Sequence, residues 1–205
     1  MYSPPYNRVE KRAEVVEFMR ANNFPILVTG TGGVLHASHL PITVHETGEQ
    51  IVIDMHMAKN NPQWNEFFDD EVMVIFAGPH AYVSPRWYAD KERVPTWNYA
   101  AVHAYGVPKI HSDKKTKGES QRRLIESIDP QWLPKHDALH QEYVEQMLDG
   151  IVNFSIPVTR LDTRWKLSQN RGRREMELIA AALDKSSDST ERALAALTRK
   201  HLVED

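Results

Sequence analysis

The stretch FPILVTGTGGVLHASHLPITVHETGEQIVIDMHM, residues 24–57, decides the fold. Apolar and β-branched runs alternate in it with two glycine-containing turns, GTGG at 30–33 and HETGE at 45–49. Short runs separated by such turns are typical of antiparallel strands joined by hairpins. The stretch therefore predicts three consecutive strands, over residues 24–29, 34–44 and 50–57.

The third of these strands shows a period of two. Ile51, Ile53 and Met55 are predicted to lie on one face, and Asp54 and His56 on the other. A strand with one apolar and one polar face covers a core on one side only. We therefore expect this strand to help build the core.

The rest of the chain predicts further strands and then helices. Because strands and helices do not alternate, and because neither GxGxxG nor GxxxxGK[ST] occurs, a doubly wound nucleotide-binding fold is not expected. The pattern favours a mainly β protein with flanking helices (α+β), built as a barrel or a sandwich. The expected elements are helices at 10–23 and 58–68, strands at 71–78 and 81–85 split by Gly78–Pro79, a loop at 88–95, a long strand or strand pair at 96–111, helices at 114–128 and 138–149, one or two strands at 151–168, and helices at 172–183 and 190–203.

Composition limits the classes of function. The chain has 205 residues, a net charge of −3 and no cysteine, so disulfides and thiolate chemistry are excluded, and no overall basic bias marks a nucleic-acid binder. The polar, Pro-rich residues 1–12 do not resemble a signal peptide, and the longest apolar run, Val72–Gly78, is too short to span a bilayer. We expect a cytoplasmic protein.

The segment HMAKNNPQW, residues 56–64, is a candidate anion site. A strand is predicted to end there and a helix to begin, and Lys59 comes just before the helix. A helix N-terminus with free N–H groups and a nearby cation attracts phosphate. The alternative is a surface turn with a solvated lysine.

The segment VPTWNYAAVHAYG, residues 94–106, is rich in aromatic side chains that carry a polar group. Trp97, Tyr99 and His103 share one strand face, and Thr96 and Asn98 lie on the other. Such a face suits a flat ring ligand, or else core packing or a homodimer contact. The later segment WKLSQN, 165–170, either walls a pocket or ends a strand before a helix cap.

Two further clusters, one of histidines and one of arginines, give weaker evidence for a functional site. His36 and His39 would point to opposite faces of a strand, so they do not form a good metal site. Arg171, Arg173 and Arg174 form a basic cluster that is either a solvated helix turn or a contact for an anionic partner such as DNA. The linker between the last two helices is longer than the turn of a helix-turn-helix motif.

Five segments together resemble a known family, the PaiB-type FMN-binding proteins, also called FMN-binding negative transcriptional regulators. The resemblance runs from Met1 to about Arg174. It implies a split β-barrel of the FMN-binding or pyridoxamine-phosphate-oxidase-like type, a homodimer with FMN at the subunit interface, and a division into a flavin domain, 1–170, and a C-terminal helical extension, 171–205, packed on the barrel or dimer. The segments are ASHLP (37–41), HMAKNNPQW (56–64), VIFAGPHAYVSPRWY (74–88), VPTWNYAAVHAYG (94–106) and WKLSQNR (165–171).

The same resemblance implies which residues contact the cofactor. One group lies along the isoalloxazine ring, a second holds the phosphate, and a third closes the site, at least in part from the other subunit. FMN would carry the redox chemistry, and no residue is identified as a catalytic acid or base. The three groups are, in that order, Ser38, His39 and Leu40; His56, Ala58, Lys59 and Asn60; and Thr96, Trp97, Asn98, Trp165, Lys166 and Gln169.

The physiological role has three readings. The protein is a flavin-linked redox protein, with or without a role in negative regulation of transcription; or a DNA-binding or indirect repressor without enzymatic activity; or a haem-binding split barrel with His80 or His103 as the axial ligand. The electron donor and the substrate do not follow from the sequence.

Overall fold

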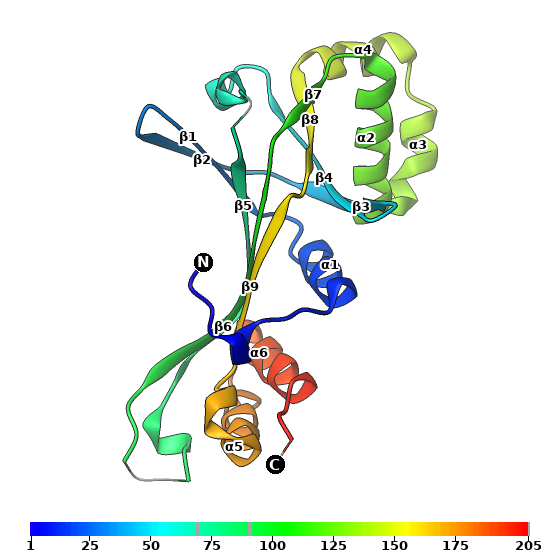
Figure 1. Cartoon of the computed structure of the whole chain (residues 1–205). Helices are drawn as coiled ribbons and strands as arrows, with labels where there is room; N and C mark the ends of the chain where they lie inside the picture. Colours follow the sequence, from blue (N-terminus) through cyan, green and yellow to red (C-terminus); the bar gives the residue numbers. More distant parts are fainter. Residues whose placement is uncertain (69, 90–91, 205) are drawn as a thin grey trace. The chain divides into compact units, whose positions relative to one another are not determined.

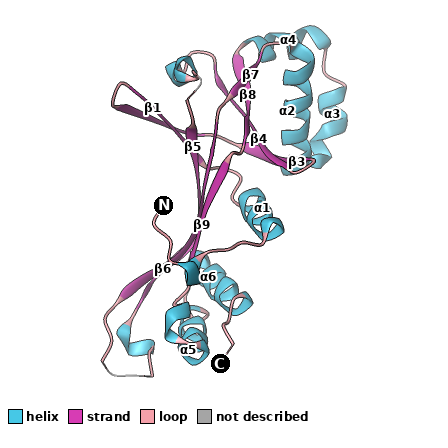
Figure 2. Cartoon of the chain, in the orientation of Figure 1, coloured by secondary structure: helices cyan, strands magenta, loops and turns pink. Residues whose placement is uncertain are grey.

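The computed structural model describes residues 1–68, 70–89 and 92–204, in which strands form two sheets (Figures 1 and 2). The five-stranded sheet has the order β2-β1-β5-β6-β9, and the four-stranded sheet has the order β3-β4-β8-β7. The strands are β1 (Ile26–Thr31), β2 (Val34–His39), β3 (Ile42–Thr47), β4 (Gln50–Ala58), β5 (Val72–Val83), β6 (Thr96–Gly106), β7 (Lys109–His111), β8 (Ile151–Pro157) and β9 (Arg160–Lys166).

Helices precede, connect and follow these strands, and α3 is the one α-helix in the described ranges that the sequence did not predict. The short 3₁₀ helices are labelled η. All of those described except η5 begin at proline, whose fixed φ suits a first helical position. The helices are α1 (Arg12–Ala21), α2 (Lys114–Ile128), α3 (Leu133–Asp137), α4 (Gln141–Asp149), α5 (Arg173–Leu183), α6 (Ser189–Lys200), η1 (Pro5–Asn7), η2 (Pro62–Glu66), η3 (Pro85–Trp87), η4 (Pro130–Trp132) and η5 (Gln169–Arg171).

The chain forms two compact units, each built from several segments. The first unit comprises Met1–Val15, Ala77–Val102 and Asp162–Asp205, and the second comprises Val16–Phe76 and His103–Leu161. Helices α5 and α6 belong to the first unit, and α2, α3 and α4 belong to the second. The predicted division at residues 170 and 171 stays a prediction.

Strand β4 shows how the second unit builds its core. Ile51, Ile53 and Met55 are at most 3% exposed, which confirms the predicted apolar face. The opposite face is polar and is covered by α2, because Arg123 Nη2 of α2 donates a hydrogen bond to Asp54 Oδ2 at 2.6 Å. In Figure 1 the helices α2, α3 and α4 lie together beside β3 and β4.

The hairpin of β1 and β2 confirms the first predicted turn. Gly32 and Gly33 have φ values of 61° and 85°, which glycine adopts without steric cost and which two-residue hairpin turns require. The strands pair antiparallel, from Ile26 opposite His39 to Thr31 opposite Val34. The hairpin fixes the position of the segment that the family resemblance places along the flavin ring.

The single strand predicted over residues 34–44 is wrong. The strand is interrupted at Leu40 and Pro41, so that β2 joins one sheet and β3 joins the other. Proline has no N–H to donate to a neighbouring strand, and the N–H of Leu40 donates a hydrogen bond to the carbonyl of Pro25 at 3.2 Å. The break therefore separates the two sheets.

The predicted split of residues 71–85 at Gly78–Pro79 is also wrong, because β5 runs unbroken from Val72 to Val83. The pairing of β1 with β5 covers Met73, Val74 and Ile75. Pro79 lies beyond that pairing, so its missing N–H removes no bond to β1.

The α-helix predicted over residues 58–68 is a five-residue 3₁₀ helix, η2. Asn61 caps it, since its Oδ1 accepts a hydrogen bond from the N–H of Gln63 at 3.0 Å, and Pro62 occupies the first position. A helix this short lacks the macrodipole of a longer one, so the dipole part of the predicted anion site is withdrawn. The cation Lys59 remains.

In the first unit, α5 and α6 pack together through buried apolar side chains of Met176, Ile179, Leu183 and Leu194.

The two positions 90 and 91 of the expected loop 88–95 lie outside the described residues. Among the described residues, no helix combines the length and apolar character needed to cross a membrane. The predicted fold class, sheets with flanking helices, is confirmed.

Candidate functional site

The predicted flavin contacts fall into two clusters, one in each unit. The β2–η2 cluster, residues 36–40 and 56–66, lies in the second unit, and the β6–β9 cluster, residues 96–98 and 165–169, lies in the first. Within each cluster, hydrogen bonds join segments that are distant in the sequence.

Asn61 joins the two segments of the β2–η2 cluster. Its Nδ2 donates a hydrogen bond to Ser38 Oγ at 3.0 Å, while its Oδ1 caps η2. The same turn is held against the end of β8, because the N–H of Lys59 donates to the carbonyl of Gly150 at 2.9 Å. The segment that the family places on the ring and the segment that it places on the phosphate therefore lie side by side.

Lys59 and Asn60 are exposed at this turn. Within the described part of the chain, the structure records no acidic partner for the Lys59 ammonium and no acceptor for the N–H of Asn60. The N–H of Asn61, by contrast, donates to the carbonyl of Ala58 at 2.9 Å. An exposed, uncompensated cation beside a free amide fits an anionic group such as the phosphate of FMN.

Two residues of this cluster were missed at the level of sequence, Gln63 and Glu66. Gln63 is 3% exposed, and its Nε2 donates to the carbonyls of Leu27 and His36 and to Thr29 Oγ1 at 3.2–3.3 Å. Two carbonyl partners fix the orientation of the amide, because a carbonyl only accepts. Gln63 Oε1 is buried and has no hydrogen-bond partner in the described chain.

Glu66 extends this network. It accepts a hydrogen bond from Thr29 Oγ1 at 2.6 Å, and its Oε1 lies against Nδ1 of His36. His36 thus belongs to a pair with a carboxylate and does not face His39, which stacks on Phe24 at a centroid distance of 5.8 Å. The Asn-Pro-Gln order that caps η2 was the one sequence signal that pointed to this network.

The side chain of His56 differs from that of Lys59 in charge. Burial lowers the pKa of the His56 imidazole from its ordinary value, so the ring is neutral at neutral pH. It lies on the polar face of β4, opposite Asn153 of β8. Lys59 therefore supplies a positive charge that His56 does not. The contacts of His56, His39, Leu40 and Ala58 with FMN stay predictions.

Lys166 organises the β6–β9 cluster. Its Nζ donates hydrogen bonds to Thr96 Oγ1 at 2.5 Å and to the carbonyl of Trp97 at 2.8 Å. Burial and, second, the charge of Arg164 lower the pKa of Lys166. Gln169 closes the turn after β9, because its Nε2 donates to the carbonyl of Trp165 at 2.5 Å. These hydrogen bonds involve five of the predicted contacts, Thr96, Trp97, Trp165, Lys166 and Gln169.

Asn98 forms a second link in this cluster, to Ser168, which the prediction left out. Asn98 Nδ2 donates to Ser168 Oγ at 3.0 Å, and Ser168 Oγ donates back to Asn98 Oδ1 at 3.2 Å. Ser168 has a φ of 68°, in the left-handed region that disfavours a non-glycine residue. The buried pair of hydrogen bonds holds Ser168 in this strained conformation.

The two tryptophans of this cluster differ in exposure. Trp165 is 1% exposed and is part of the core, whereas Trp97 is 49% exposed. The rings of His80 and Tyr82 lie 5.9 Å and 6.3 Å from that of Trp97. Trp97 therefore presents an aromatic face that a flat ligand can contact.

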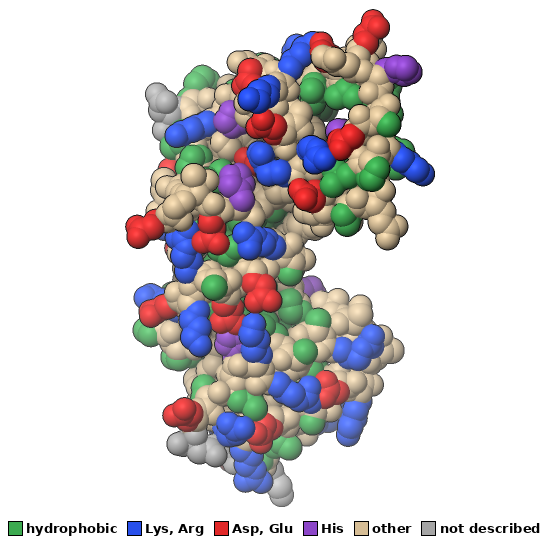
Figure 3. Space-filling view, turned by 90° about the vertical axis from the view of Figure 1, so that its right-hand side faces the viewer, with side chains coloured by type: hydrophobic (Ala, Val, Ile, Leu, Met, Phe, Trp, Pro, Cys, Tyr) green, Lys and Arg blue, Asp and Glu red, His purple; other side chains and the backbone are tan. Residues whose placement is uncertain are grey.

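The structure also places the arginines of the DNA-binding hypothesis and the histidines of the haem hypothesis. Arg173 pairs with Glu177 at 2.9 Å, and Figure 3 shows positive and negative side chains interspersed on the face it draws. His103, half-buried, and the exposed His80 are the two candidate haem ligands. In the described ranges, no group of three or more His, Asp or Glu residues could hold a metal ion.

Comparison with known proteins found a matching family, related sequences and similar folds. Residues 1–160 match the family described as "Putative FMN-binding domain". The chain is 34% identical over 210 residues to the protease synthase and sporulation protein PAI 2 of Bacillus subtilis, and the match covers 98% of each protein.

Two solved structures share the fold. One is a FAD and heme binding protein from Mycobacterium smegmatis, with a TM-score of 0.58, 13% identity, and coverage of 77% of this chain and 72% of that one. The other is a flavocytochrome from Azotobacter vinelandii, with a TM-score of 0.56, 14% identity, and coverage of 79% and 74%.

The fold and the matched family define the class, a split β-barrel protein with an FMN-binding domain. The chain belongs to the PaiB-type FMN-binding family, and FMN is its cofactor.

Proposed function

We propose that this protein is a flavin-linked redox protein that acts as a homodimer, in which FMN contacts the β2–η2 cluster of one subunit and the β6–β9 cluster, at least in part, of the other. The observation that carries the proposal is the exposed cation Lys59, held by the Asn61–Ser38 hydrogen bond beside the segment that the family places on the flavin ring. Bound FMN supplies the transfer of electrons or hydride, and the protein supplies binding and orientation.

A small set of hydrogen-bond donors is available for the phosphate of FMN. Because the N–H groups of Lys59 and Asn61 are already bonded to Gly150 and Ala58, the available groups are Lys59 Nζ and the amide of Asn60. A charge-assisted hydrogen bond from an ammonium to phosphate is shorter and stronger than a neutral one. Lys59 is therefore assigned the main phosphate contact.

The ring is assigned to Trp97. Its half-exposed indole offers a flat apolar surface, and Lys166 fixes the backbone that carries it through the carbonyl of Trp97. An aromatic side chain stacks on a flat ring with little loss of its own conformational freedom. Positioning by Lys166 keeps the indole in place before the ligand arrives.

The homodimer is supported by the exposure of β2. This strand lies at the edge of the five-stranded sheet, and Val34 and Leu35 are 57% and 74% exposed, although they alternate in direction. An edge strand with apolar side chains exposed on both faces is usually covered by another chain. A second copy of this protein is the partner that the proposal assigns to it.

An absorption spectrum of the purified protein tests the flavin part. We expect a yellow protein, or a protein that takes up added FMN with a shifted flavin spectrum, and release of FMN identified by its mass. A colourless protein that does not bind FMN would contradict the proposal. A shifted Soret band after adding hemin, without flavin binding, would favour the haem reading.

A role in gene regulation is the second candidate, favoured by similarity to a protein named for protease synthesis and sporulation. Direct DNA binding would depend on the exposed Arg171 and Arg174, because Arg173 is paired. Its affinity for DNA would fall steeply with salt, and replacing both arginines by alanine would reduce that dependence. No measurable affinity at low salt would leave only an indirect mechanism.

A further inference from the structure

A pocket of about 290 Å³ lies in the second unit, where the end of α1, the start of β3 and the end of α2 meet. None of the predicted flavin contacts lines it. A dry cavity of about 150 Å³ is large enough to hold benzene, so this pocket has room for a small organic molecule. The lining residues are Arg20, Asn23, Ile42, Thr43, Val44 and Ser127.

Arg20 gives the pocket its charge. Its Nε donates a hydrogen bond to the carbonyl of Val44 at 2.9 Å, so the backbone of β3 orients the guanidinium. No other partner of this side chain is recorded in the part of the chain that the structure describes, so the N–H groups of both terminal nitrogens are available. Two parallel N–H groups of a guanidinium match the two oxygens of a carboxylate.

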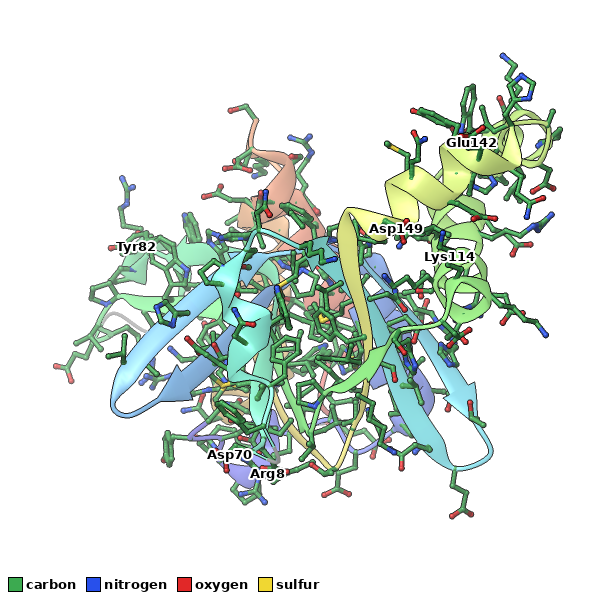
Figure 4. All side chains as sticks on the ribbon, turned by 90° about the horizontal axis from the view of Figure 1, so that it is seen from above. Arg8, Asp70, Tyr82, Lys114, Glu142 and Asp149 are labelled. Atoms are coloured by element: carbon green, nitrogen blue, oxygen red, sulfur yellow. The ribbon has the colours of Figure 1, made fainter. Side chains whose placement is uncertain are left out.

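The charge of Arg20 is not balanced by an acidic residue of the pocket. Lys114, another cation of this unit, pairs with Glu145 at 3.0 Å and with Asp149 at 3.4 Å, and Figure 4 labels Lys114 and Asp149 close together. Among the described residues that line the pocket, by contrast, none is aspartate or glutamate. This arrangement favours an acid as the ligand and opposes a cation.

Asn23 supplies a second polar group. The preceding Asn22 caps the end of α1, because its Nδ2 donates a hydrogen bond to the carbonyl of Phe18 at 2.8 Å. For the side-chain amide of Asn23, no partner is recorded within the described ranges. Its backbone does not require asparagine either, since Ser168 is the one described non-glycine residue with a positive φ. The amide of Asn23 is therefore available to a ligand.

Ser127 supplies an acceptor from α2. Its hydroxyl donates a hydrogen bond to the carbonyl of Leu124 at 2.8 Å, which uses the proton and leaves lone pairs of Oγ for another donor. A hydroxyl group of a ligand both donates and accepts. It can therefore donate to Ser127 Oγ and accept from Asn23 Nδ2.

We infer that this pocket binds a small hydroxy acid, whose carboxylate contacts the terminal nitrogens of Arg20 and whose hydroxyl contacts Asn23 and Ser127. A large apolar substituent should add little affinity, because the side chains of Ile42 and Val44 in the wall formed by β3 are at most 7% exposed. The site shares no residue with the proposed FMN contacts, so its test does not depend on FMN binding.

The experiment compares 2-hydroxybutyrate with three probes on the full chain. Butyrate lacks the hydroxyl, 2-hydroxybutyramide lacks the charge, and inorganic phosphate is an anion of another shape. Binding is followed by shifts of backbone amide signals in two-dimensional NMR spectra, at constant ionic strength. We expect shifts at residues 20–23, 42–44 and 127, with 2-hydroxybutyrate binding about tenfold more tightly than its amide and about threefold more tightly than butyrate.

Variants separate the contact with the carboxylate from the contact with the hydroxyl. Arg20→Gln should lower the affinity for 2-hydroxybutyrate to that of the amide and leave binding of the amide unchanged. Asn23→Ala should make 2-hydroxybutyrate and butyrate bind equally. The matched control is Arg192→Gln, which should change neither affinity, because Arg192 is also exposed and bonded to a backbone carbonyl, that of Ser186.

A further variant tests the charge if Arg20→Gln does not fold. Asn23→Asp places a negative charge in the pocket and should abolish binding of 2-hydroxybutyrate. The inference would be overturned by the absence of shifts in these segments at millimolar probe, by equal affinities for the acid and its amide, or by tightest binding of phosphate. Unchanged binding of the acid to a folded Arg20→Gln protein, or to Asn23→Asp, would overturn it as well.

Discussion

At the scale of single residues, Lys59 is the residue that we propose distinguishes FMN from riboflavin, which lacks the phosphate. Its position in the sequence, between a strand and a proline-containing turn, was enough to select it. Gln63 and Ser168 could not be selected in this way. Gln63 matters because it contacts Leu27, Thr29 and His36, and a glutamine two residues after an asparagine gives no sign of those contacts.

Replacing Lys59 tests the phosphate contact. Lys59→Ala should weaken FMN binding by about 1.5–3 kcal/mol, the range for a hydrogen bond to a charged group, and leave riboflavin binding unchanged. Titration calorimetry with both ligands measures the difference. Lys115→Ala, an exposed lysine of α2, is the matched control. Equal losses for the two ligands would show that Lys59 does not contact the phosphate.

Gly106 tests a close approach of two backbones. A Cβ at this position would lie 2.2 Å from the carbonyl oxygen of Pro157, so the end of β6 would have to move. Gly106→Ala should lower the free energy of unfolding by about 1–3 kcal/mol, as overpacking does. Gly118→Ala has room for its methyl group and should instead raise it by about 0.5–1 kcal/mol. Urea unfolding of both proteins checks the contrast, and equal stabilities would refute it.

At the scale of elements, the pattern of turns and periods predicted most strands and helices, but it missed two boundaries. Pro41 and Pro79 both lack a backbone N–H, but the strand is interrupted at Pro41 and continues through Pro79. The difference is the partner strand. A proline interrupts a strand only where its N–H would have been needed for pairing, and pairing is set by the sheet.

The turn before η2 can be tested by separating the two roles of Asn61. Asn61→Asp keeps the capping oxygen but loses the donor to Ser38 and adds a negative charge next to Lys59, so FMN affinity should fall while stability changes little. Asn61→Ala loses the cap as well, and the free energy of unfolding should fall by about 0.5–2 kcal/mol. Calorimetry and urea unfolding give the two readouts. A stable Asn61→Asp protein with unchanged FMN affinity would show that the link to Ser38 does not matter for binding.

At the scale of the whole molecule, exposed β2 and half-exposed Trp97 are understood best if a second chain and a ligand cover them. The sequence offered Trp97 as a ring contact but left core packing open, and it did not indicate that β2 is exposed, because Val34, Leu35 and Trp97 are types that pack equally well in a core. Burial distinguishes these cases. Trp165, which the family resemblance placed at the flavin site, is 1% exposed in the first unit, and its contact with FMN stays a prediction.

The homodimer predicts a mass in solution of twice the 23.6 kDa of one chain, measurable by light scattering after size exclusion. Leu35→Asp places a charge on the exposed edge strand and should shift the protein to monomer, because burying an unpaired charge opposes association. Leu178→Asp, at an exposed position of α5, should leave the mass unchanged. A monomeric original protein would contradict the prediction.

The sequence by itself determined the two turns of residues 24–57 and the strands beside them, apart from the interruption at Pro41, together with the late helices, the membership in an FMN-binding family and the candidate cation Lys59. These depend on backbone preferences and motifs that lie within a few neighbouring residues. Only the tertiary structure decided that β2 and β3 join different sheets, that Asn61 bonds to Ser38, 23 positions away, and that Lys166 bonds to Trp97, 69 positions away. Such contacts depend on how the sheets pair and pack, which brings distant side chains together and leaves no local pattern in the chain.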